Sequence, residues 1–323
     1  RMVVHLALPC ILLLYGVSAK EDSFQLRMPD VIPEEESYVC TSTPVNEETF
    51  IVGFEPLNEK HNAHHILLFG CEESGSEDLI WDCGEMSSGR NGGLEKASPC
   101  KSKPQILYAW AHSAPKLELP KDVGFKVGGQ SSIKSVVMQV HYMKDSDERD
   151  QSGVSIKYTD AEMPKQASTM LLVTGGVVPP LSIESFETAC TIDEDVELHP
   201  FAYRTHTHRH GVDVSGWIVR EDGGADSWTL LGRRDPQLPQ MFVPVNDSSV
   251  VIKKGDVVTA RCVMRNEEDR AVEVGPTGDD EMCNLYVMYY VSGSKTLSDN
   301  TCYSPGAPEY YWSSEARLNH IPI

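Results

Sequence analysis

The sequence is poor in positive charge and in closely spaced cysteines. Its 323 residues include 28 Lys and Arg against 48 Asp and Glu, so the formal net charge is −20. A charge of this size repels nucleic-acid backbones and anionic lipid, so we expect neither nucleic acid nor a membrane surface as a partner. It favours a soluble protein, and we expect a monomer. No pair among the 9 cysteines has the Cys-x-x-Cys spacing of a zinc cluster, which argues against such a site.

Long hydrophobic runs are also lacking, and none reaches the length of a membrane-spanning helix. Residues 1–19 contain a short apolar run, Ile11–Leu14, followed by the small residues Val17-Ser18-Ala19 and then by the charged Lys20-Glu21-Asp22. This order is typical of a cleaved signal peptide, although a buried strand or a membrane anchor is an alternative. We therefore expect a protein of the secretory pathway that resides in the lumen or a secretory granule or is secreted.

Cleavage of that segment removes Cys10 and leaves an even number of cysteines. An even number after a signal peptide predicts a disulfide framework formed in an oxidising compartment. The eight are Cys40, Cys71, Cys83, Cys100, Cys190, Cys262, Cys283 and Cys302. A single N-glycosylation sequon, Asn246-Asp247-Ser248, adds the expectation of a glycoprotein.

Sustained helical periodicity is absent. The chain instead contains short apolar or alternating runs, such as Ser135–Met143 and Asp256–Met264, separated by its 24 Gly and 20 Pro and by Asn and Asp. This pattern predicts an all-β fold built from sandwiches. The polar stretch Lys157–Ser168 lies near the middle and has four of the eight cysteines on each side. We predict two domains, residues 20–163 and 164–323, after a signal peptide at 1–19.

Two histidines in the second predicted domain have the spacing of strand neighbours on one face. Residues i and i+2 of a strand point the same way, so Arg204, His206 and His208 share a face. Two imidazoles so placed suit one metal ion, whereas solvated surface histidines are the alternative. His210 adds a further imidazole for which the sequence suggests no role.

A second strand pattern, beginning at Met282, makes copper the better interpretation of that pair. Alternation puts one set of side chains toward the core, namely Leu285, Val287, Tyr289 and Val291. The opposite face is polar and carries thioethers: Met282, Asn284, Tyr286 and Met288. Methionine is most often a core residue, but a thioether added to two imidazoles suits Cu(I) better than zinc.

The first predicted domain offers His64 and His65 in sequence and His141 on another strand, where Gln139 shares its face. Adjacent residues of a regular strand point to opposite sides, so His64 and His65 can share a metal only where the strand twists, bulges or ends. Spacing alone therefore favours one core and one surface histidine.

Four motifs change this balance, because together and in this order they resemble peptidylglycine α-hydroxylating monooxygenases of the copper type II, ascorbate-dependent monooxygenase family. The resemblance covers nearly all of the chain after the signal segment. The motifs are His64-His65-Ile66-Leu67-Leu68-Phe69-Gly70-Cys71, Gln139-Val140-His141-Tyr142, Tyr203-Arg204-Thr205-His206-Thr207-His208 and Asp280-Glu281-Met282-Cys283-Asn284-Leu285-Tyr286.

The resemblance implies two tandem jelly-roll-like domains that face each other across a cleft, each holding one copper ion. It assigns an electron-transfer copper to the first domain, bound by His64, His65 and His141. It assigns an oxygen-activating copper to the second, bound by His206, His208 and Met282. Ascorbate is then the reductant and O₂ the co-substrate, and the α-carbon of a C-terminal glycine in a peptide is hydroxylated. A separate lyase would convert the product to the amide.

The resemblance also assigns substrate and disulfide residues. Arg204 would bind the peptide carboxylate, with Asn284, Tyr286 and Gln139 assisting in binding or positioning. The implied disulfides are Cys40–Cys83, Cys71–Cys100, Cys190–Cys302 and Cys262–Cys283. One family disulfide is missing, since Gln151 stands where its second cysteine would be and no partner precedes Cys40 after the signal segment.

Two alternatives keep the copper but change the function. An aromatic-amine hydroxylase related to dopamine β-monooxygenase would use the same coppers, but its cationic substrates disfavour an arginine aimed at them. A secreted copper-binding protein without turnover has no need of two differently ligated sites or of a substrate-facing arginine. Oxygen uptake that depends on ascorbate and a glycine-extended peptide distinguishes enzyme from carrier.

Overall fold

The computed structural model describes residues 21–58, 62–84, 93–111, 114–275, 280–315 and 318–322. The predicted signal peptide, residues 1–19, lies outside them. Every regular element of the described residues is a β-strand, which confirms the all-β prediction. Among the same residues there is no helix long and apolar enough to cross a membrane.

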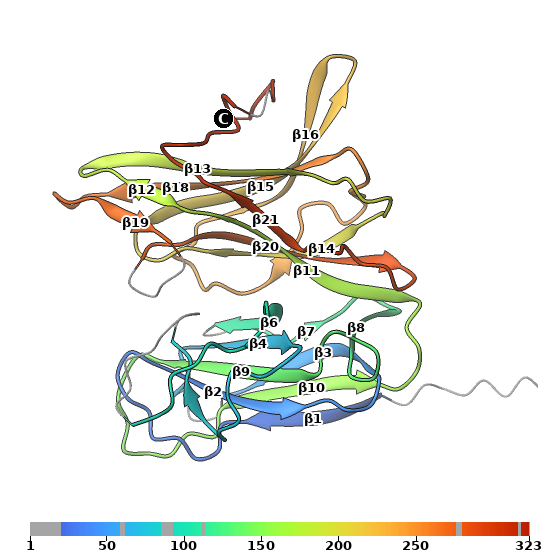
Figure 1. Cartoon of the computed structure of the whole chain (residues 1–323), viewed down its shortest axis with the longest axis vertical. Helices are drawn as coiled ribbons and strands as arrows, with labels where there is room; N and C mark the ends of the chain where they lie inside the picture. Colours follow the sequence, from blue (N-terminus) through green and yellow to red (C-terminus); the bar gives the residue numbers. More distant parts are fainter. Residues whose placement is uncertain are drawn as a thin grey trace, which may run out of the picture.

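The N-terminal half forms a sandwich of two sheets, the lower body in Figure 1. One sheet contains β1 (Glu21–Arg27), β10 (Gly153–Thr159), β3 (Thr49–Leu57) and β8 (Val123–Val127) in that order, with β7 (Leu117–Glu118) paired to β3. The other contains β5 (Trp81–Asp82), β2 (Ser37–Pro44), β9 (Ser135–Tyr142), β4 (His65–Cys71) and β6 (Gln105–Ala111). Its central strand, β9, is buried along its whole length, as its β-branched and apolar sequence predicts.

The C-terminal half forms the upper body in Figure 1. There β21 (Thr301–Ser304), β11 (Lys165–Thr174), β20 (Cys283–Ser292), β14 (His199–His206) and β17 (Val243–Pro244) form one layer. The facing sheet contains β13 (Ser182–Thr191), β18 (Val257–Asn266), β15 (Gly211–Asp222) and β16 (Ala225–Arg234), and β12 (Gly176–Val178) pairs with β19 (Val272–Val274) beside it. A short parallel pairing of β8 with β11 joins one sheet of each half into a single ten-stranded sheet.

Strand alternation predicts a core environment for one face of β20 and leaves the environment of the other face open. Leu285, Val287, Tyr289 and Val291 lie in the core of the C-terminal sandwich, which confirms that face. Tyr286 and Met288, on the opposite face, belong to the core cluster of the N-terminal sandwich. The polar and thioether-bearing face of β20 therefore packs toward the other domain.

There are four disulfides among the described residues, two within each half, with the pairing that the resemblance implies. They are Cys40–Cys83, Cys71–Cys100, Cys190–Cys302 and Cys262–Cys283. Where the family disulfide is missing, Gln151 donates a hydrogen bond of 2.6 Å from Nε2 to Asp30 Oδ1. All seven residues of β1 pair with β10, so a backbone ladder holds the N-terminal strand in place.

An ion pair between the buried Asp256 and the partly exposed Arg220 closes the turn before β18. Asp256 is 2% exposed and accepts hydrogen bonds from Arg220 Nε at 2.7 Å and from the Lys253 backbone N–H at 3.0 Å. Burial opposes ionisation of Asp256, but these donors outweigh it, so the pKa lies below its usual value. The folded state is therefore stabilised above the unfolded pKa of about 3.9, and this stabilisation is lost as pH falls through the folded pKa.

We expect Asp256→Asn to lower the free energy of unfolding at neutral pH by about 1–3 kcal/mol, measured by denaturant titration. Its unfolding free energy should also fall less steeply than that of the wild type between about pH 5 and pH 2. The exposed Asp299, paired with Lys103, is the control, and Asp299→Asn should change stability by less than about 0.5 kcal/mol. If the unfolding free energy fell equally steeply with decreasing pH in the wild type and in Asp256→Asn, the stabilising role of the Asp256 carboxylate would be contradicted.

Candidate active site

Three histidines of the N-terminal sandwich converge at the start of β4. The strand begins at His65, and His64 lies in a bend immediately before it, with its backbone N–H bonded to the carbonyl of His141 at 2.9 Å. The bend frees His64 from strand alternation, so its ring turns to the same side as that of His65. This strand end is the condition under which the two adjacent histidines can share one metal.

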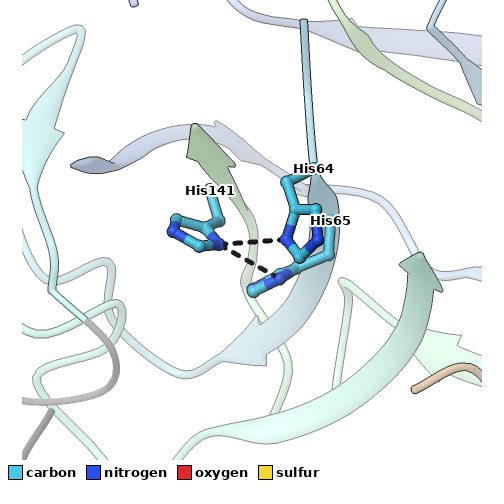
Figure 2. A group of neighbouring side chains, drawn as sticks. All are labelled: His64, His65 and His141. Atoms are coloured by element: carbon cyan, nitrogen blue, oxygen red, sulfur yellow. Dashed lines mark hydrogen bonds between the residues drawn. The ribbon is translucent and has the colours of Figure 1, made fainter. Parts of the chain in front are cut away.

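The ring nitrogens of this cluster are close enough to bind one ion. His141 Nδ1 lies 3.4 Å from the Nδ1 atoms of both His64 and His65 (Figure 2), and one ligand atom from each ring lies within 4.8 Å of the others. His141 comes from β9, whose register pairs it directly with His65 on β4. Two neighbouring strands and one bend thus assemble three imidazoles.

Neighbouring side chains orient the His141 ring. Tyr38 stacks on it with ring centroids 4.2 Å apart, and Glu36 Oε2 lies 3.3 Å from Nε2. A carboxylate at Nε2 favours the tautomer that leaves the Nδ1 lone pair directed into the cluster. Desolvation, followed by the charges of His141 and Arg204, holds the pKa of His65 well below its usual value, so His65 is neutral and can donate its lone pair.

The second set of candidates lies at one end of the β14–β20 ladder. The antiparallel register pairs Arg204 with Tyr286 and His206 with Asn284. His208 and Met282 each lie two residues beyond the last pair, after β14 and before β20 respectively. The register therefore brings Arg204 and His206 beside Tyr286 and Asn284, and the chain segments just beyond the last pair carry His208 and Met282.

Both histidines of this set use Nδ1 for protein contacts. His208 Nδ1 lies 2.6 Å from the carbonyl of Asp280, and His206 Nδ1 contacts Gln240 Oε1. An Nδ1–H that donates to such an oxygen leaves the Nε2 lone pair for a metal. The two ring centroids are 5.4 Å apart. Desolvation and the charge of Arg204 hold the pKa of His206 well below its usual value.

Arg204 is buried beside these rings. It is 3% exposed, its Nε donates to the Gln240 carbonyl at 2.9 Å, and its guanidinium carbon lies 5.2 Å from the centroid of the Tyr286 ring. A second nitrogen of its guanidinium lies 3.5 Å from His206 Nδ1. A guanidinium held over an aromatic face and by a backbone carbonyl keeps one orientation.

The two histidine sets open into one cavity between the sandwiches. Its volume is about 400 Å³, and its walls include His64, His65 and His141 from one half and Arg204, His206 and His208 from the other. Residues 236–240 also contribute to its lining. A second guanidinium at the wall, that of Arg209, is paired with Glu268. The cavity thus has imidazoles on both sides and a buried arginine in its wall.

Four further candidates, Met282, Asn284, Tyr286 and Gln139, are not among the residues that line this cavity. Asn284 is buried, and its Nδ2 lies 3.9 Å from Met282 Sδ and 3.5 Å from the Tyr286 hydroxyl. Gln139 is fully buried, and its Nε2 donates to the Gly84 carbonyl at 2.6 Å beside the Cys40–Cys83 disulfide. Gln139 is not among the residues that line the cavity, so its predicted role in substrate positioning stays a prediction.

Some residues of the site gave no signal in the sequence. Gln240 contacts both Arg204 and His206 from a proline-containing loop, and Tyr38 reaches His141 from β2. Neither residue has a spacing relation to a histidine motif that a strand or turn would explain. Only the tertiary arrangement brings them to the site.

Two family models match this chain in tandem. The N-terminal domain model of the copper type II ascorbate-dependent monooxygenases matches residues 24–149, and the C-terminal domain model of the same family matches residues 165–315. The chain belongs to the copper type II ascorbate-dependent monooxygenase family. All six candidate metal ligands lie inside the matched segments, three in each.

Individual relatives in this monooxygenase family differ in their degree of similarity. The chain is 40% identical over 95% of its length to peptidylglycine alpha-amidating monooxygenase of Rattus norvegicus, and 38% identical over 93% to a Xenopus laevis enzyme, peptidyl-glycine alpha-amidating monooxygenase A. It covers 30% and 31% of those two proteins. Dopamine beta-hydroxylase of Canis lupus familiaris is 28% identical over 80% of the chain, which covers 44% of that protein. The chain thus spans about a third of the length of the amidating relatives.

Proposed function

We propose that this chain is a copper- and ascorbate-dependent monooxygenase that hydroxylates the α-carbon of a C-terminal glycine in peptides. Arg204 carries this proposal, because its buried guanidinium lines the cavity that both histidine sets share. The relatives named as peptidylglycine alpha-amidating monooxygenases support it, with identities of 38–40%. The reaction consumes O₂, two electrons and two protons, and it yields the α-hydroxyglycine peptide and water.

We propose one copper in each half. His64, His65 and His141 fit a copper ion because three ring nitrogens already converge within 4.8 Å. His206, His208 and Met282 fit a second, because two rings with occupied Nδ1 atoms stand beside the strand end that carries a thioether, and soft sulfur favours Cu(I). When bound, the copper ions supply one-electron redox chemistry and the activation of O₂, with ascorbate as the reductant.

The residues of the chain itself bind and orient the substrate in this proposal. The Arg204 guanidinium pairs with the peptide carboxylate, which holds the adjacent α-carbon near His206 two residues along the strand. Tyr286 supports the guanidinium through its ring, and Asn284 fixes the Tyr286 hydroxyl. The walls of the two sandwiches limit the water that reaches the reacting carbon.

The aromatic-amine hydroxylase is the second candidate, favoured by the 28% identity to dopamine beta-hydroxylase. Its substrate would bring an ammonium group into a cavity that already contains a buried guanidinium, which costs electrostatic energy. A non-catalytic copper-binding protein is the third. Neither candidate uses an arginine in the wall of the cavity that the two histidine sets share, so we rank both below the peptide enzyme.

Further features of the proposal concern the setting of the enzyme. We propose that the protein is a monomer. We also propose that it resides in the lumen of the secretory pathway, in secretory granules or outside the cell, and the four disulfides support such an oxidising compartment. A separate lyase would act on the product. Asn246 is exposed in the loop after β17, which makes the sequon accessible to glycosylation. The proposed domain boundary, between residues 163 and 164, falls between β10 and β11.

Oxygen uptake tests the proposal. The copper-loaded protein should consume O₂ with ascorbate only when a peptide ending in free glycine is present, and mass spectrometry should show a gain of one oxygen atom in that peptide. Tyramine and the same peptide ending in alanine are the controls. Uptake with tyramine and none with the glycine peptide would establish the amine hydroxylase instead, and no uptake with either substrate would favour the copper-binding protein.

A further inference from the structure

The backbone ladder between β14 and β20 ends one step before the proposed ligands. The last pair is His206 with Asn284, and continuation of the same antiparallel register would pair His208 with Met282. Both of these residues lie outside the strands. Their backbone N–H groups therefore have no acceptor in the ladder, and a buried N–H group needs another one.

The carboxylate of Glu281 is that acceptor. Its Oε1 accepts from the backbone N–H of Met282 at 2.9 Å and from that of His208. Its Oε2 accepts from the backbone N–H of His210 at 2.9 Å. Glu281 is only 2% exposed. One buried carboxylate thus binds the turn after β14 and the start of β20, where the ladder no longer does.

The backbone of Glu281 is itself fixed by β19. Its N–H donates to the Glu273 carbonyl at 2.8 Å, and its carbonyl accepts from the Gly275 N–H at 2.9 Å. The preceding carbonyl, that of Asp280, lies 2.6 Å from His208 Nδ1. The segment that carries the carboxylate is therefore anchored on one side and contacts both the ring and the backbone of His208 on the other.

His210 completes this arrangement. It is 8% exposed, its Nδ1 lies 3.1 Å from Glu281 Oε2, and its Nε2 lies 3.4 Å from Glu268 Oε1. It does not line the cavity. The imidazole that the sequence left without a role thus packs behind the ligands, between two carboxylates, and restricts the orientation of the Glu281 side chain.

We infer that Glu281, held by His210, is a positioning residue that sets the spacing between His208 and Met282 and so brings an imidazole and a thioether to one copper ion. This inference rests on the proposed function, since it takes His208 and Met282 as ligands of the second copper. The alternative is a carboxylate that only stabilises the turn. If Glu281 is a positioning residue, its substitution changes the copper–sulfur contact. If it only stabilises the turn, its substitution changes the stability of the fold alone.

Glu281→Gln is the main test. The amide keeps the size of the side chain but replaces one acceptor oxygen by an NH₂ group, which faces backbone N–H donors. We expect the variant to lose about 10–100-fold in affinity for the second copper, the usual effect of removing an outer contact to a metal ligand. X-ray absorption of the Cu(I) protein should show a weakened or missing Cu–S contribution, while the first copper stays bound.

Glu187→Gln is the matched control. Glu187 is also buried, 1% exposed, and binds Arg261 and the backbone of Ser313 in the same half of the chain, and it does not line the cavity. It should lower Tm without changing copper stoichiometry or the Cu–S contribution. His210→Leu is a second test that keeps the carboxylate, and it should weaken the Cu–S contribution by less than Glu281→Gln does.

The outcomes separate the inference from the proposed function. Wild-type protein without a second copper or without Cu–S scattering would overturn the proposed ligand set, and the inference with it. If the wild type has both, then an unchanged Cu–S contribution and copper affinity within twofold in Glu281→Gln would overturn the inference alone. If Glu281→Gln fails to fold, the Cu–S contribution and the copper affinity of His210→Leu are the test. No change in either quantity in His210→Leu would also overturn the inference.

Discussion

Replacement of Met282 by isoleucine should abolish turnover while the first copper site stays filled. Met282 is 3% exposed and lies immediately before β20, whose first residues pair with the end of β14, and isoleucine retains its apolar character and approximate volume. What is lost is the thioether, the one soft donor of the proposed set. We expect kcat/KM for a glycine-extended peptide to fall by on the order of 10³-fold or more, about 4 kcal/mol of activation free energy.

Metal analysis and a matched methionine make this result specific. Met288 lies on the same face of β20, is 0% exposed and packs in the core between the sandwiches, so Met288→Ile reproduces the packing change without a proposed ligand. That variant should retain its two coppers and most of its activity, with a loss of stability below about 1.5 kcal/mol. One copper per wild-type chain, or a preference for zinc at both sites, would refute the two-copper proposal.

The sequence predicts those parts of the site that strand geometry alone determines. Alternation along β14 brings Arg204 and His206 to one face, and the core face of β20 is correct in the structure, but the strand ends at His206 and alternation does not position His208. It fails for His64 and His65, because alternation separates them and only the start of β4 at His65 brings their rings together. Strand ends depend on tertiary hydrogen bonding and are not encoded in a local pattern.

Other parts of the site arise from contacts between distant segments. Gln240 reaches Arg204 from 36 residues away, and Glu281 reaches the His210 backbone from 71. The polar face of β20 looked anomalous in the sequence because its partner is the other sandwich, against which Tyr286 and Met288 pack. No periodicity within one strand can report a surface that belongs to another domain.

Binding of the peptide carboxylate by Arg204 predicts the largest difference between substrates. A glycine-extended peptide and its C-terminal amide differ only at the group that would meet the guanidinium. The amide would leave a buried cation without its counter-charge, which costs about 2–5 kcal/mol. We therefore expect the wild-type enzyme to process the free acid at least about 10²-fold faster than the amide, compared as kcat/KM.

Arg204→Gln should remove this preference. The kcat/KM of the variant should fall by a similar factor with the acid and change little with the amide, so that the two values become nearly equal. Both coppers should stay bound, because the arginine is not a ligand. Arg261→Gln is the matched control. Its guanidinium carbon also lies over an aromatic ring, 4.4 Å from the centroid of Trp312, but its acidic partner is Glu187 and it does not line the cavity.

The control variant should preserve the ratio of acid to amide rates even if it lowers stability, because Arg204, and not Arg261, lines the cavity that holds the substrate in the proposed complex. Glycine is required in the same geometry, since a carboxylate held at Arg204 fixes the adjacent α-carbon near His206 and a side chain on that carbon would crowd it. Peptides ending in alanine should therefore react far more slowly than those ending in glycine. Equal rates for acid and amide on the wild-type enzyme would show that Arg204 does not bind the carboxylate, and the amine hydroxylase would then be the better proposal.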